Sequence, residues 1–120
     1  MQLPTNLYEI LDQIERRPGL YLRHPTLNGL VDFVTGYEMA LMFHRIEEGE
    51  KPTFLGFSDF ALRRLGKPGW RVEVDLKTRH ETRYGGLTWS QAINQEEPDD
   101  EKALKLFFEL LHAYRGNISH

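Results

Sequence analysis

The 120-residue sequence contains no cysteine, which excludes disulfide bonds and thiolate metal sites. It also contains no apolar run near the roughly 20 residues that a membrane-spanning helix needs, so no membrane contact is expected. Residues 1–5 carry neither the charged nor the apolar segment of a secretory signal. These three absences predict a cytoplasmic protein.

The familiar catalytic motifs are missing as well. Segment 66–69 (GKPG) lacks the spacing and the terminal Lys-Ser/Thr pair of a phosphate-binding loop. Ser58 and Ser90 lie outside any nucleophile-elbow pattern. The five histidines show no metal-ligand spacing. We therefore expect a protein that acts by binding rather than by catalysis, with neither a metal nor a cofactor.

The residues that are present have an ordinary globular composition, 40% hydrophobic and 28% charged. A chain of this length has the size of one domain and can bury a core without covalent staples. It contains no internal repeat and no low-complexity segment. These observations predict a single helical domain over residues 1–120.

Most of the chain carries signals of helix formation. The first expected helix begins at Asn6, which has capping-box spacing to Glu9, and ends at the Pro18-Gly19 pair. A long helix from Thr26 has an apolar arc over about half of its wheel, which is typical of a central helix. Gly36 inside this helix predicts close approach by another element. Five helical segments are expected. They are 6–17, 26–48, a third that begins at Ser58 or Asp59 and ends at Gly66 or Pro68, 88–93, and a last one from Asp99 or Asp100 to Gly116.

One segment breaks the helical pattern. From residue 70 to 79, Val72, Val74 and Leu76 alternate with charged residues, which is the period of a β-strand. The Gly85-Gly86 pair could turn this strand, although a partner strand is not obvious. The predicted fold is therefore mainly α, a four- to five-helix bundle with a short strand-like or hairpin insertion near residues 70–86.

Charge is distributed unevenly along the chain, whose net charge is −3. Residues 63–83 hold seven basic and three acidic side chains, whereas the segments before and after them are acidic. A nucleic-acid-binding module is one interpretation, and an exposed Trp70 and Tyr84 on a contiguous basic face would favour it. Because acidic residues interrupt the basic segment, a solvated strand face is the better interpretation, and nucleic acid is not the expected partner.

Glu38 falls inside the apolar arc of the long helix, where a carboxylate must be paired, protonated or functional. We predict a structural ion pair between Glu38 and Arg16 or Arg17, near the Pro18 turn. The alternative is a small enzyme with a site around Glu38, His44 and Tyr37. A solvent-accessible Glu38 with a perturbed pKa in a cleft would favour the enzyme, and a buried ion pair would count against it.

Several segments together carry a resemblance. They are 7–11 (LYEIL), 16–22 (RRPGLYL), 36–38 (GYE), Trp89 with Ile93, and 103–111. They resemble a group of small helical bacterial proteins, some of which look like immunity proteins encoded beside polymorphic or contact-dependent toxins. In this sequence the stretch from about 70 to 86 is longer and more strand-like than the corresponding link in that group.

The resemblance implies a cognate toxin domain as the partner, for example a nuclease in contact-dependent growth inhibition. Such toxins are commonly basic around the substrate cleft, so an acidic inhibitor can associate quickly through steering. Specificity must then lie where the sequence can change without unfolding the core. The predicted partner-binding residues are Glu96, Glu97, Asp99 and Asp100 in the acidic linker, and Arg71, Glu73, Lys77 and Arg79 in the strand-like insertion.

Overall fold

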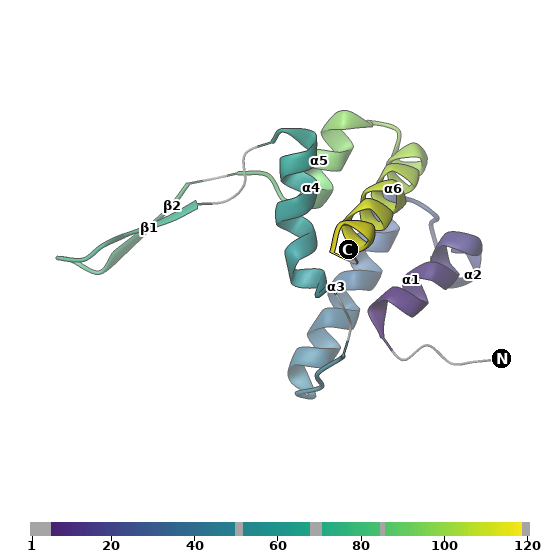
Figure 1. Cartoon of the computed structure of the whole chain (residues 1–120), viewed down its shortest axis with the longest axis horizontal. Coiled ribbons are helices and arrows are strands. Elements are labelled where there is room, and N and C mark those ends of the chain that lie inside the picture. The colour runs from purple at the N-terminus through teal and green to yellow at the C-terminus, as the bar shows by residue number, and fades with distance from the viewer. Residues whose placement is uncertain (1–5, 50–51, 68–70, 85, 119–120) are drawn as a thin grey trace.

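A computed structural model describes residues 6–49, 52–67, 71–84 and 86–118, without the side chains of 71–73, 81–84, 117 and 118. Within these ranges the chain is mainly helical with one β-hairpin, which confirms the predicted fold class (Figure 1). The elements in order are α1 (Leu7–Arg16), α2 (Pro18–Tyr21), α3 (Leu27–Phe43), the 3₁₀ turn η1 (Phe54–Gly56), α4 (Phe57–Leu65), β1 (Arg71–Asp75), β2 (His80–Tyr84), α5 (Trp89–Glu96) and α6 (Asp100–Ile118).

Side chains close in sequence begin three of these helices, as expected. The Asn6 carboxamide accepts a hydrogen bond from the Glu9 amide at 3.0 Å, and the Thr26 hydroxyl accepts one from the Gly29 amide at 3.2 Å. Thr88 forms a full capping box at the start of α5. Each cap satisfies a backbone N–H that the helix leaves without a partner.

Three helices end at other residues than the sequence predicts. Helix α5 continues past Ile93 to Glu96, which was expected to belong to the acidic linker. Helix α3 stops at Phe43 rather than at 48, and Arg45 then adopts a left-handed backbone conformation with φ of 53°. The chain turns back so that the Glu48 carboxylate accepts hydrogen bonds from the Leu7 amide, at 3.0 Å, and from the Tyr37 hydroxyl. A carboxylate at the N-terminus of α1 is a favourable partner for its unpaired amides. Helix α6 continues through Gly116 to Ile118.

One hydrophobic core joins the helices, and a cluster of aromatic rings lies inside it. Phe57 is fully buried, with its ring centroid 5.3 Å from that of Phe107 and 5.5 Å from that of Trp89. The expected buried stripe of α6 is confirmed, because all six residues are buried: Ala103, Leu104, Phe107, Phe108, Leu111 and Tyr114. Helix α1 is held on α6 by an ion pair of 2.9 Å between Arg115 and Asp12.

Strands β1 and β2 form an antiparallel hairpin that projects from the helical body (Figure 1). The last pair joins Asp75 to His80, so the loop consists of residues 76–79, with Arg79 in a left-handed conformation at φ of 55°. The expected turn at Gly85-Gly86 is therefore wrong, and Gly85 itself lies outside the described residues. The alternation of apolar and charged residues did not reveal this turn, because it continues without a break from β1 into the loop. No glycine or proline marks the loop.

The C-terminal half of α3 extends beyond the other helices (Figure 1). Met42 and Phe43 keep 66% and 69% of their surface exposed, whereas Leu27 and Leu30 are fully buried. Gly36 has open space around it, so the expected close approach by another element is wrong. The buried residues of α3 thus all lie in its first half, and its C-terminal end faces solvent.

Candidate functional site

Two residues of the acidic linker, Asp99 and Asp100, stabilise the fold through hydrogen bonds to backbone amides. The Asp99 carboxylate accepts hydrogen bonds from the Glu101 amide at 3.0 Å and from the Lys102 amide at 3.3 Å, which makes Asp99 the cap of α6. The Asp100 carboxylate accepts from the Asn28 amide at 3.3 Å and so joins the start of α6 to the start of α3. Their predicted role in partner binding stays a prediction, and a substitution at either residue would also change the fold's stability.

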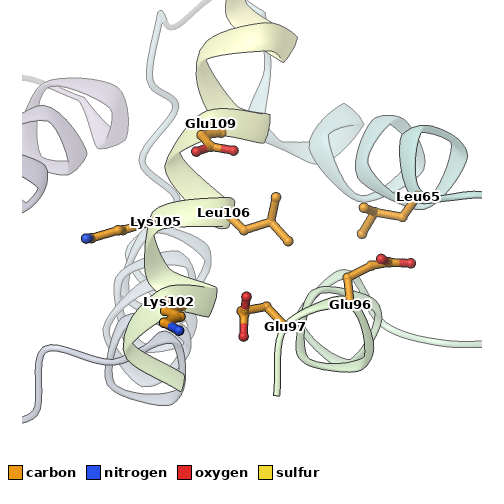
Figure 2. Close-up of a pocket in the computed structure, with 7 residues that line it drawn as sticks. All are labelled: Leu65, Glu96, Glu97, Lys102, Lys105, Leu106 and Glu109. Carbon is orange, nitrogen blue, oxygen red and sulfur yellow. The ribbon is translucent and has the colours of Figure 1, made fainter. Parts of the chain in front are cut away.

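The other two acidic residues, Glu96 and Glu97, line an open groove between the ends of α4 and α5 and the side of α6 (Figure 2). The groove has a volume of about 370 Å³. Leu65 and Leu106 point toward each other across it, and Glu109 lies beside Leu106 on α6. Its lining is Leu65, Glu96, Glu97, Lys102, Lys105, Leu106 and Glu109. We name this site the acidic groove.

Five members of the acidic groove were missed by sequence reasoning: Leu65, Lys102, Lys105, Leu106 and Glu109. Leu106 and Glu109 come from α6, where they follow Lys102 at helical spacing, and Leu65 comes from the end of α4. The 102–106–109 spacing gives one face of α6, but only the fold shows which helix ends border that face. Lys67 forms an ion pair of 3.6 Å with Glu96, which ties the groove to the segment that leads into the hairpin.

The predicted residues of the hairpin lie away from the acidic groove. Lys77 and Arg79 are exposed in the loop at the tip of the projection (Figure 1). Arg71 and Glu73 belong to β1, opposite Tyr84 and Thr82, but their side chains lie outside the described part of the structure. The same holds for the Tyr84 side chain, and Trp70 lies wholly outside the described residues. The exposure of these two aromatic residues, which would favour nucleic-acid binding, therefore concerns atoms outside the described part of the structure.

The predicted ion pair of Glu38 with Arg16 or Arg17 is wrong. All three residues are exposed, and the Arg16 side chain donates to the Asp12 carbonyl at 3.4 Å within its own helix. In the described part of the chain the ion pairs are Lys67–Glu96 and Arg115–Asp12, and Glu15 shares a hydrogen bond of 2.8 Å with His112. The prediction failed because Glu38 faces η1 and the starts of α4 and α5, whereas Arg16 and Arg17 lie at the end of α1.

Glu38 instead borders a second pocket, of about 310 Å³, between α3, η1 and the starts of α4 and α5. Partial burial raises the pKa of the Glu38 carboxyl above its ordinary value. The described residues that line the pocket are Val31, Val34, Thr35, Glu38, Phe54, Leu55, Ser58, Thr88, Trp89 and Ser90, and none of them is basic. We name this site the Glu38 pocket.

The Glu38 pocket meets only part of the condition that would favour a small enzyme. Glu38 is accessible, lines a pocket and has a shifted pKa, as that alternative requires. Tyr37 and His44 are not in its lining. The Tyr37 hydroxyl donates to Glu48, and His44 caps the end of α3. The three residues of the expected catalytic group thus do not converge.

The described residues contain no cluster of three or more histidine, aspartate or glutamate side chains that could hold a metal ion. Among the helices described here, none has the length and apolar character required to cross a membrane. No protein-family model, curated protein or solved structure matches this chain.

Proposed function

We propose that this chain is an immunity-type protein that binds and neutralises a cognate bacterial toxin domain. The observation that carries the proposal is the hairpin. Every described side chain from Val74 to His80 is exposed, and Leu76 leaves 88% of its surface in solvent. An isolated two-stranded hairpin is at best marginally stable in water, and it gains stability by packing against something else.

The hairpin is suited to a partner because it lies outside the core. Its sequence can vary without loss of core packing, which is what the specificity element of a toxin–immunity pair requires. Val74 and Leu76 add apolar contact area, and Lys77 and Arg79 add positive charge at the tip. Apolar side chains surrounded by charged ones are the usual composition of a protein–protein contact.

The acidic groove supports the same proposal through its charge. Its lining holds three carboxylates, Glu96, Glu97 and Glu109, and two lysines, Lys102 and Lys105, beside the apolar pair Leu65 and Leu106. The carboxylates therefore exceed the lysines of the lining by one charge. A partner that is basic around its own cleft would be attracted by these charges before contact, which raises the association rate. The hairpin and the groove together give two separate points of attachment on one toxin.

The first experiment tests protection. The chain is co-expressed with the toxin whose reading frame the proposal expects beside its gene, and growth and complex formation by the purified pair are measured. We expect protected growth and a stable complex. Unprotected cells, together with no complex at micromolar concentrations, would show that the immunity proposal is wrong.

The second experiment separates the two attachment points by kinetics. Reversal of Glu96 and Glu97 to lysine should slow association by about tenfold at low salt and make it less salt-sensitive. The matched control reverses Glu47 and Glu101, which are exposed and outside the groove, for the same change in net charge. Leu76→Ala should instead raise the dissociation rate, because contacts made after docking act mainly on that rate.

A further inference from the structure

The Glu38 pocket combines one carboxylate with a neutral lining. Glu38 has no hydrogen bond and no ion pair with any described residue, and its surroundings in the pocket are apolar or hydroxyl-bearing. Val31 and Val34 come from the same helix, Phe54 and Leu55 from η1. The pocket therefore holds a negative charge that the described residues leave uncompensated.

A carboxylate in such a place favours a positive ligand. Water solvates it incompletely, and burial is the cause of its raised pKa. A neutral ligand would remove more water from the carboxylate without replacing the lost interactions, and an anion would be repelled by it. A cation that donates hydrogen bonds to the carboxylate would offset the desolvation, because charge-assisted hydrogen bonds are the strong ones.

The remaining lining fits one kind of cation. Thr35, Ser58 and Ser90 offer hydroxyl oxygens that can accept the other N–H donors of a guanidinium or ammonium group. Leu55 is 87% exposed at this site and provides an apolar surface at the rim. A volume of about 310 Å³ lies at the small end for ligand pockets, which suits a short chain with one charged head.

We propose that the Glu38 pocket binds an organic cation, a guanidinium or alkylammonium group carried on a short aliphatic chain. Glu38 pairs with the charged head, the hydroxyls of α3, α4 and α5 accept its remaining donors, and the aliphatic chain packs against Val31, Val34 and Leu55. This site is separate from the hairpin and from the acidic groove. It does not depend on the immunity proposal.

Two sources carry this chemistry, a free small cation and the arginine side chain of another protein, so the experiment has an arm for each. Agmatine and the capped tripeptide Gly-Arg-Gly are titrated into the isotope-labelled full chain, and backbone amide shifts are followed by NMR. The neutral counterpart is capped Gly-citrulline-Gly, which has nearly the same shape without the charge. We expect shifts at amides around Glu38 in α3 and at the start of α5.

Variants locate the site. Glu38→Gln should weaken the binding of agmatine about tenfold, which is the loss of one charge-assisted hydrogen bond. The control Glu47→Gln removes an equal charge from an exposed position outside the pocket and should leave the affinity unchanged. Because the Gln variant keeps the shape of the side chain, its amide spectrum should match that of the unchanged protein and show that it is folded.

The relative affinities of these ligands distinguish the two sources of the cation. Tighter binding of the arginine tripeptide assigns the pocket to a protein side chain, and equal or tighter binding of agmatine assigns it to a free small cation. Equal binding of the citrulline peptide, or unchanged affinity of Glu38→Gln for agmatine, would overturn the proposal. So would the absence of shifts with both cations up to about 10 mM, roughly ten times a dissociation constant of 1 mM.

Discussion

Glu38 carries a charge that its surroundings shield in part from water. Its pKa is raised because burial disfavours the ionised form, and no described cation stands near enough to reverse that effect. The carboxylate therefore acts against stability whenever it is ionised. This is the reverse of the stabilising ion pair that its place on the helical wheel suggests.

The first prediction concerns the stability of Glu38→Gln. A folded-state pKa above the unfolded value of about 4.5 means that the folded protein binds the proton more tightly. The stabilisation by that proton is complete below the unfolded pKa and is lost as the pH rises through the folded pKa. At pH 7 the Gln variant should unfold with a free energy a few tenths of a kcal/mol higher than wild type, a small gain because the side chain is largely exposed.

Urea unfolding at pH 7 and at pH 4 measures this difference, which should shrink at the lower pH. Glu47→Gln, at an exposed position, is the control and should show no change at either pH. A Gln variant that is less stable than wild type at pH 7 would mean that the carboxylate makes a stabilising contact.

The residues that cap helices show what a sequence can and cannot reveal. Asn6, Thr26 and Thr88 cap amides three residues ahead, so the local pattern predicted all three. Asp100 bonds to an amide 72 residues away, and Glu48 to one 41 residues away. Long-range partners of this kind depend on how the helices pack, and no local spacing contains that information.

At the scale of elements, helix α3 shows why a correct hydrophobic periodicity predicted the surroundings of only part of the helix. Its apolar residues were expected to place it at the centre of a bundle, and this holds for Leu27, Leu30 and Val34. Beyond Val34 no residue of α3 is buried, and Met42 and Phe43 reach solvent. The length of a helix relative to its neighbours, which hydrophobic periodicity does not encode, decides how much of an apolar arc is buried.

The hairpin allows a prediction by excision. Residues 71 and 84 are directly paired, so their backbones lie about 5 Å apart and a two-glycine linker can replace 71–84. Because the described side chains of the hairpin are exposed, the free energy of unfolding should change by no more than about 1 kcal/mol. Protection against the toxin should be lost if the immunity proposal holds.

Thermal unfolding and the co-expression growth assay together test the excision. A control chain in which only Lys77 and Arg79 are replaced by alanine keeps the hairpin and shows how much of the loss comes from charge at its tip. A large fall in stability after excision would place the hairpin among the elements that support the core. Full protection by the excised chain would remove the hairpin from the partner surface.

At the scale of the whole molecule, a single aromatic cluster connects the parts of the helical body. Phe107 on α6 is fully buried and lies 5.3 Å from Phe57 on α4 and 5.3 Å from Trp89 on α5, between ring centroids. One shared core of this kind predicts that the helices unfold together. The sequence supplied the stripe on α6 but not the rings from α4 and α5 that meet it.

Phe107→Ala should therefore lower the free energy of unfolding by about 3–5 kcal/mol, because truncation removes buried contacts and leaves a cavity. Lys105→Ala on the exposed face of the same helix should change it by less than about 0.5 kcal/mol. Urea unfolding followed by both tryptophan fluorescence and far-ultraviolet circular dichroism should give one coincident transition. Two separate transitions, or a Phe107→Ala chain as stable as wild type, would contradict a single shared core.

The projecting hairpin also exposes strand edges through which copies of the chain can associate at high concentration. Among the described residues its sheet has only two strands, so each strand has one backbone edge whose N–H and C=O groups are left to water. Such an edge is a template to which an extended segment of another chain can add as a third strand. The same arm that is free to meet a partner is thus open to self-association, and the charged residues in both strand sequences are the kind that discourage it.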